Sequence, residues 1–118
     1  MANNGLILGC NDGTLVRIES GTIVATSKSH QSAVRLVLPS PKGAWCVSLG
    51  KDRSVFATLA DLSATVLLHR SRDYLYDGCM SDDGQNILVC DGAGDVTKIH
   101  LDRALDNYDH PTLAARVI

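Results

Sequence analysis

The sequence predicts an all-β fold in which one unit of antiparallel strands recurs along the chain. Apolar runs of five or six residues alternate with turn residues, a spacing typical of short strands that fits helical periodicity poorly. The strand-turn-strand segment around Asp12 recurs around Asp52, at an offset of 40, and again in 86–100 at an offset of 41. The turn 40–43 recurs at 81–84, also at an offset of 41. Two landmarks that share one period indicate a repeat protein.

The first unit spans residues 5–27, and its strands are expected at 6–10, 15–19 and 22–26. Asp12 and Gly13 favour a tight turn before the second strand, because an Asp side chain accepts backbone N–H bonds and Gly adopts a positive φ. This unit contains no counterpart of the first strand of the next unit. We therefore expect it to have three strands.

The second unit spans residues 30–68, and its four strands are expected at 34–38, 44–49, 54–60 and 64–68. The turn 39–43 ends the first strand, since its two prolines cannot donate to a strand ladder and Gly43 permits a positive φ. Residues 50–53 have the composition of a second tight turn. This unit is the most complete of the three.

The third unit spans residues 73–118, and its strands are expected at 73–80, 86–90 and 95–101. The two glycines of 92–94 precede a strand rather than a helix, so they indicate a hairpin turn and not a phosphate-binding loop. After a long connection, residues 112–118 are expected to form the fourth strand. A helix over 101–105 is the alternative for that connection. Residues 1–118 are thus predicted to form a single segment of three units.

The second unit also carries a resemblance to a known family. In order and spacing, the sequence resembles a WD repeat of the β-propeller family at His30, Val34, Ser40-Pro41-Lys42-Gly43, Ser48 and Asp52. Thr58 stands where the family has Trp, and Asp61 stands in for its final Asp, displaced by two residues. The resemblance implies a partial β-propeller of about three WD-repeat-like blades, each a four-stranded antiparallel sheet, with the first blade lacking its inner strand.

The resemblance further implies that His30, Ser48 and Asp52 form a buried hydrogen-bond network between the inter-blade turn and the turn after the second strand. Thr58 shortens that network because it replaces the Trp. A Ser, a His and an Asp that converge can also be a hydrolase triad. Ser48 lies mid-strand, however, without the G-x-S-x-G elbow that exposes a nucleophile. We therefore expect a structural network and no enzyme.

The other two blades are expected to have weaker networks. The Ser48 position is Leu8 in the first blade and Val89 in the third, and Ser71 occupies the His30 position in the third. Asp12 is expected to brace its own turn by accepting backbone N–H bonds.

Composition and charge exclude several classes of protein. The net charge of −2 and the scattered basic residues give no nucleic-acid footprint, no apolar run is long enough for a transmembrane helix, and the N-terminus lacks the basic region of a signal peptide. The cysteines lack C-x-x-C spacing and are expected to be buried free thiols, with a disulfide or a metal site as alternatives: Cys10, Cys46, Cys79 and Cys90. A cytoplasmic setting follows, with the nucleus as another intracellular possibility.

Three residues are candidates for contact with a partner. The single Trp, Trp45, is predicted to be either a core residue or an interface anchor, because its ring is amphipathic. Residues 69–72 are expected to form a solvated basic loop between blades, in which Arg70 and Arg72 could contact an acidic partner.

No metal site or cofactor is predicted. The sequence contains two groups of potential metal ligands. The first lacks the D-x-D-x-D-G spacing and the distal Glu that a calcium loop needs: Asp73, Asp77, Asp82 and Asp83. The second is expected on a solvated loop, where a metal site is not expected: Asp106, Asp109 and His110.

These observations predict a non-catalytic protein–protein interaction scaffold, a partial propeller completed by self-association or by a partner chain. Propellers typically have 4–8 blades, so three cannot close a ring. Two open blade faces of about 300 Å² each would forfeit on the order of 15 kcal/mol at 25 cal/mol per Å², as much as a domain's whole stability. The alternative function is a propeller that binds a small ligand or a glycan, although the turn residues do not repeat a recognition set.

Overall fold

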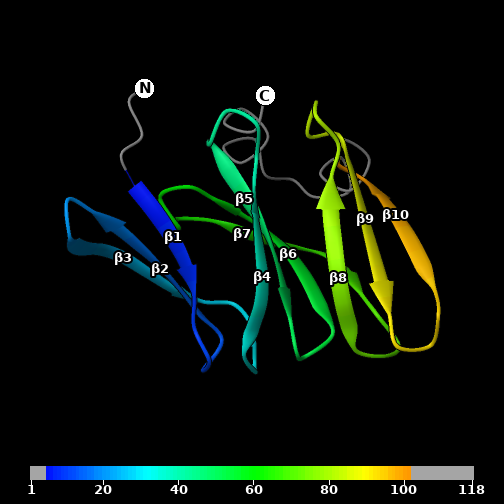
Figure 1. The fold of residues 1–118 in the computed structure, drawn as a ribbon. Helices are drawn as coiled ribbons and strands as arrows, with labels where there is room; N and C mark the ends of the chain where they lie inside the picture. Colours follow the sequence, from blue (N-terminus) through cyan, green and yellow to red (C-terminus); the bar gives the residue numbers. More distant parts are fainter. Residues whose placement is uncertain (1–4, 102–118) are drawn as a thin grey trace.

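Ten strands form three antiparallel sheets in residues 5–101, the part of the chain that the computed structural model describes (Figure 1). Sheet A consists of β1 (Gly5–Gly9), β2 (Thr14–Glu19) and β3 (Thr22–Lys28). Sheet B consists of β4 (Val34–Pro39), β5 (Trp45–Gly50), β6 (Ser54–Leu59) and β7 (Thr65–Arg70). Sheet C consists of β8 (Leu75–Met80), β9 (Asn86–Asp91) and β10 (Val96–His100). The prediction of an all-β chain with antiparallel sheets is confirmed.

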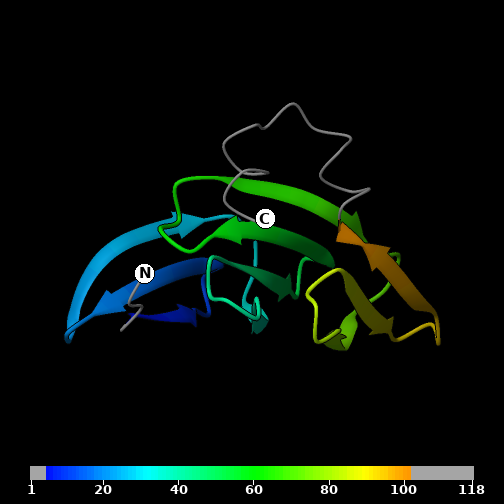
Figure 2. The same ribbon diagram turned by 90° about the horizontal axis from the view of Figure 1, so that it is seen from above.

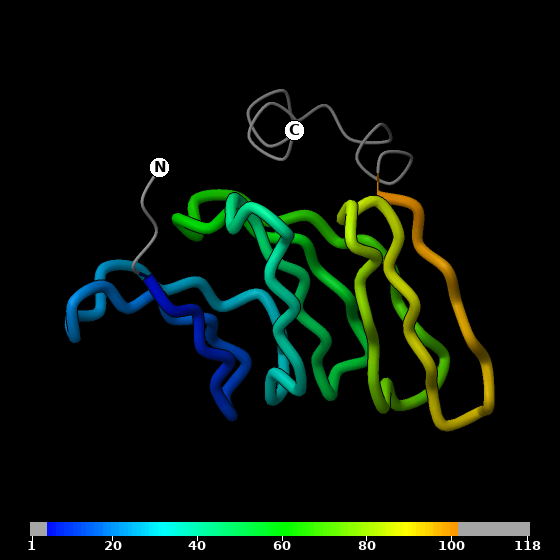
Figure 3. The backbone as a smooth tube through the Cα atoms, turned by 45° about the horizontal axis from the view of Figure 1, so that its top comes forward, coloured from blue at the N-terminus to red at the C-terminus, as the bar shows by residue number. Residues whose placement is uncertain are grey.

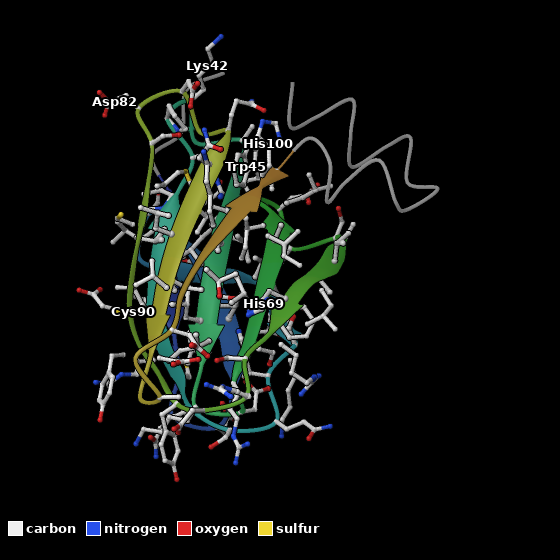
Figure 4. The ribbon with its side chains drawn as sticks, turned by 90° about the vertical axis from the view of Figure 1, so that its right-hand side faces the viewer. Lys42, Trp45, His69, Asp82, Cys90 and His100 are labelled. Atoms are coloured by element: carbon white, nitrogen blue, oxygen red, sulfur yellow. The ribbon has the colours of Figure 1, made fainter. Side chains whose placement is uncertain are left out.

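Each sheet is a meander, so short turns decide where its strands end. Gly43 and Gly84 close the β4–β5 and β8–β9 turns, and both have a φ of 74°, a conformation that a Cβ disfavours. These two turns lie at the same end of the molecule, as Lys42 and Asp82 show in Figure 4. Glycine is therefore required at equivalent positions of two successive units.

The hydrogen bonds of these turns repeat with the same offset. Ser40 N donates to Trp45 O, and Ser81 N donates to Asn86 O, both at 2.9 Å. In the reverse direction, the N–H of Trp45 donates to Ser40 Oγ at 3.2 Å and that of Asn86 to Ser81 Oγ at 3.1 Å. A serine hydroxyl thus closes both turns in the same way.

The strand registers also repeat. Where β4 pairs with β5, the register shifts between Val34 and Leu36, and where β8 pairs with β9 it shifts between Leu75 and Asp77. A bulge bends its strand and leaves one residue unpaired, so two bulges at equivalent positions give both sheets the same bend. β1 and β2 pair in the register of β5 and β6 at an offset of 40.

The sheets stand side by side in the order A, B, C (Figures 1 and 2). β1 lies beside β4, while β4 and β5 lie beside β8. The first strands of the three sheets therefore gather along one side of the molecule, and the last strands lie toward the opposite side (Figures 2 and 3).

The main core lies between sheets B and C. It is built from alternate residues of facing strands, among them Trp45, Val47, Leu49, Val55, Ala57 and Leu59 of sheet B and Ile87, Val89 and Ile99 of sheet C. Sheet A is joined to sheet B by Arg17, whose guanidinium Nη1 donates to the carbonyl of Ala60 at 2.8 Å.

All ten strands predicted within residues 5–101 are present, with ends within two residues of the predicted ends. The predicted loop 69–72 is wrong in its first half, because His69 and Arg70 belong to β7. The β6–β7 ladder extends that far, since Val55 pairs with His69 and Ser54 with Arg70. Pro39 ends β4, an edge strand, where the missing N–H is tolerated.

The expectation of four buried thiols is only partly correct. All four cysteines are free, but only Cys46 is buried, while Cys10 and Cys90 are half-buried and Cys79 is exposed. Cys79 pairs with Leu88 on a face of sheet C that no described residue covers, which explains its exposure. Burial raises the pKa of the Cys46 thiol to about 11.

Residues 1–4 and 102–118 lie outside the described residues. The predicted strand over 112–118, most of the alternative helix over 101–105, and the group Asp106, Asp109 and His110 fall in that part. In residues 5–101, there is no helix with the length and apolar character needed to cross a membrane.

Candidate functional site

The segment between β3 and β4 carries His30 and is held by the turns on either side. His30 N donates to Gly13 O of the β1–β2 turn at 3.3 Å. From the β5–β6 turn, Lys51 N donates to Ala33 O at 2.8 Å. These bonds fix the segment between sheets A and B, where the His30 side chain is buried.

The structure brings His30, Ser48 and Asp52 together. His30 Nε2 lies 2.8 Å from Ser48 Oγ, and Nδ1 lies 3.0 Å from Asp52 Oδ1. Because a carboxylate only accepts hydrogen bonds, a neutral imidazole donates from Nδ1 to Asp52, and its Nε2 accepts the Ser48 hydroxyl. The ring thus joins the linker before β4 to the middle of β5 and to the β5–β6 turn.

Asp52 is the anionic member of this cluster. Besides His30, its carboxylate accepts the N–H of Gln31 at 2.9 Å and that of Ser54 at 3.2 Å. Burial alone would raise the pKa of Asp52, but hydrogen bonds from Ser54, Gln31 and His30 outweigh burial and lower the pKa to about 2. The carboxylate is therefore ionised at neutral pH.

Two glycines leave the room that His30 occupies. A Cβ on Gly50 would collide with Nδ1 of His30 and with Oδ1 of Asp52. A Cβ on Gly13 would collide with the backbone carbonyl of His30, and Gly13 has a φ of 94°. Both positions therefore require glycine.

The aromatic neighbour of His30 is Phe56, which the sequence reasoning did not identify. The two rings meet edge to face, with centroids 5.0 Å apart and planes at 88°. Thr58, at the position expected for Trp, bonds through its hydroxyl to Thr65 Oγ1 of β7 at 2.8 Å. Phe56 pairs with Ser48 across β5 and β6, and this register is the signal that could have identified it.

Sheet C has a different polar contact at the equivalent place. The hydroxyl of Ser71, in the His30 position, donates to Asp91 Oδ2 at 2.8 Å. Asp91 Oδ1 accepts the N–H groups of Ala93 and Asp95, both at 3.0 Å. The hydrogen bond from Ser71, followed by the backbone bonds, keeps the pKa of Asp91 below its usual value. Sequence reasoning missed Asp91, although an Asp before a glycine-rich turn is a signal for such a contact.

Asp12 lies apart from the His30 cluster. Its carboxylate accepts the Thr14 N–H at 3.0 Å within the β1–β2 turn, and the bonds from Thr14 lower its pKa. The Ser48 position is apolar in both other sheets, as Leu8 and Val89. The cluster is thus built in one sheet of the three.

The three candidate contact residues have different environments. Trp45 is buried in the core between sheets B and C, so it is not available as a surface anchor in this structure. Arg70 is exposed at the end of β7. Arg72 is exposed and pairs with Asp95 at 2.8 Å, and such an exposed pair contributes little.

The His30 cluster has the connectivity of a Ser-His-Asp triad, but Ser48 has no exposed surface. A nucleophile must be reached by its substrate, and here the sheets would have to separate first. Among the described residues, no group of three or more His, Cys, Asp or Glu side chains is arranged to hold a metal. What this arrangement does chemically is to satisfy buried polar groups across an inter-sheet boundary.

A scan of the chain against protein-family models finds no matching family. A search of curated proteins likewise finds no match.

Proposed function

We propose that this chain is a non-catalytic protein–protein interaction scaffold, a partial β-propeller of WD-repeat type that self-association or a partner chain completes. The observation that carries the proposal is the recurrence of one sheet shape at offsets of 40 and 41, with the first strands of successive sheets side by side. Closed rings of such sheets have 4–8 blades. Three sheets leave a face at each end of the stack to be covered.

The His30 cluster supports a structural role. Its members link the segment between sheets A and B to β5 and to the β5–β6 turn, and Ser71 with Asp91 provides a corresponding link between sheets B and C. A buried contact at each boundary fixes one sheet against the next. The scaffold therefore presents its end faces in a defined orientation, which docking requires.

Light scattering on a dilution series of the purified chain tests this proposal. A scaffold completed by copies of itself gives a mass above 12.6 kDa. One that needs another chain gives a monomer that unfolds without a cooperative transition or aggregates. A strict 12.6 kDa monomer with cooperative unfolding and ordinary domain stability would contradict the proposal.

A further inference from the structure

We infer that the completing chain is a second copy of this one, whose sheet C packs on the free face of sheet A, with the reciprocal contact on the other side. This inference rests on the proposed function and deepens it by naming the partner.

Each sheet has two faces, formed by alternate residues of its strands. In sheet B, the leading face contains Val47, Leu49, Val55 and Ala57 and packs on sheet C. The trailing face contains Cys46, Ser48, Phe56 and Thr58, and it lies toward the His30 segment and sheet A. By the offsets of 40 and 41, the free face of sheet C is a leading face and that of sheet A is a trailing face. The two free faces are therefore the two halves of a contact that the chain already makes internally.

Exposed apolar side chains indicate that the leading face of sheet C has no packing partner among the described residues. Val96 is the equivalent of Val55 and Leu15, both of which are 0% exposed in covered leading faces, yet Val96 is 69% exposed. Its cross-strand partner is Cys90, which lies on the outer side of sheet C in Figure 4. A shallow hollow is lined by Asp77, Cys79, Leu88, Cys90 and Val96.

The trailing face of sheet A likewise exposes apolar side chains that have no packing partner among the described residues. Leu6 is 64% exposed, whereas its equivalents Cys46 and Ile87 are 1% and 0% exposed. Leu6 pairs with Ile18, which in turn pairs with Ile23, another exposed apolar residue. An apolar row therefore crosses the whole of sheet A, and it faces no described part of the chain.

The area is sufficient for a dimer. Three strands of five residues make a face of about 14 Å by 17 Å, or roughly 240 Å². A two-chain ring covers four such faces, on the order of 1,000 Å², the lower bound expected of a specific interface. Two copies also supply six sheets, within the 4–8 of closed rings.

One polar contact of the existing A–B boundary can be repeated at the proposed interface. Arg17 donates to the carbonyl of Ala60, in the β6–β7 turn of sheet B. By the same offsets, Lys98 of sheet C is the equivalent of Arg17, and Ser20 is the equivalent of Ala60. Lys98 and Ser20 are both exposed. We expect the Lys98 ammonium to donate to the Ser20 carbonyl of the second copy.

The test uses two charge substitutions in the full chain, Leu8→Glu on sheet A and Val96→Glu on sheet C. Both side chains are exposed in the single chain, so each variant should keep the near-UV circular dichroism of Trp45. Each should raise the dimer dissociation constant at least about 100-fold, because a carboxylate would be buried at both interfaces of the ring. Tyr74→Glu is the control, since Tyr74 is similarly exposed but precedes β8, outside both faces.

Mixing the two variants separates this pairing from others. In a 1:1 mixture, the intact sheet A of one variant meets the intact sheet C of the other, so light scattering should show association that neither variant shows alone. A dimer that survives both substitutions, or that is lost with only one of them, would overturn the pairing and leave the scaffold proposal standing. A wild-type chain that is monomeric and poorly folded overturns the second copy in favour of a different partner. A stable wild-type monomer overturns both proposals.

Discussion

Replacing His30 by alanine tests whether the buried polar cluster holds the A–B boundary together. The substitution removes a ring that bonds to Ser48 at 2.8 Å and to Asp52 at 3.0 Å. It also removes the edge-to-face contact with Phe56. The Ser48 hydroxyl cannot turn to water without its partner, because Ser48 is fully buried.

The expected loss follows from these contacts. A buried Ser48 hydroxyl without a partner costs about 1–3 kcal/mol, and loss of one donor to Asp52 costs about 1 kcal/mol more. The aromatic contact contributes about 0.5–1.5 kcal/mol. His30→Ala should therefore lower the free energy of unfolding by about 2.5–5.5 kcal/mol, a large share of the 5–15 kcal/mol that a domain typically has.

Urea unfolding at a fixed protein concentration, followed by Trp45 fluorescence, measures this loss. His100→Ala is the control, since His100 is exposed on β10, and it should change stability by less than about 0.5 kcal/mol. Because removing both partners leaves no orphaned hydroxyl, the double variant with Ser48→Ala should lose at least about 1 kcal/mol less than the sum of the two single variants. A loss below about 1 kcal/mol for His30→Ala, or simple additivity, would refute the role given to this cluster.

Three further predictions concern the same boundary. Gly50→Ala should lower the free energy of unfolding, measured in urea, by at least about 3 kcal/mol, because the added Cβ would collide with His30 and Asp52. Gly21→Ala is the control. A Cβ at Gly21 has no atom within 4 Å, so this variant should lose only about 1 kcal/mol through the strain of its φ of 77°. Because the pKa of Asp52 is lowered from 3.8 to about 2, the ionised carboxylate stabilises the folded state above pH 4. Solvent screening reduces this contribution to the free energy of unfolding to roughly 1–2 kcal/mol. The contribution is lost as the pH falls from 4 through 2. Asp52→Asn should flatten this loss in urea titrations between pH 4 and 2, and an unchanged pH dependence would contradict it. The Cys46 thiol has a pKa of about 11, so about one thiol in a thousand is ionised at pH 8. Iodoacetamide reacts with the thiolate and should therefore label Cys46 only when the chain unfolds. Mass spectrometry of the native and the unfolded chain would check this.

The sequence predicted the strands well because the turns that separate them carry unambiguous residues. Gly43 and Gly84 mark positive φ values, and serines at the turn positions recur with them. The strand ends were missed where pairing with a neighbour overrides local preference. His69 and Arg70 are polar and basic, yet they extend β7 because β6 offers paired backbone groups.

The candidate site was predictable only as far as the resemblance reached. It pointed to His30, Ser48 and Asp52, which the structure brings together. Phe56 was missed because its contact with His30 depends on the β5–β6 register, which spacing along the chain does not encode. Asp91 was missed because its equivalent in sheet B is Gly50, which has no side chain that could suggest a polar contact at this position.

The equivalent boundaries A–B and B–C are joined by polar side chains of different length. In sheet B, a long His30 reaches past Gly50 to Asp52. In sheet C, the short Ser71 stands at the His30 position, and the carboxylate moves to Asp91, the equivalent of Gly50. The donor and the acceptor are thus matched in length, and a change to one alone should fail.

This matching predicts the outcome of a transplant. Ser71→His should place an imidazole against Asp91 and lose the 2.8 Å hydrogen bond, at a cost of about 2–4 kcal/mol in urea unfolding. Adding Val89→Ser, Asp91→Gly and Ala93→Asp rebuilds the sheet B arrangement at an offset of 41 and should recover at least half of that loss. If Ser71→His alone is neutral, or if the fourfold variant is no more stable than the single one, the two boundaries are not alternative solutions to one packing problem.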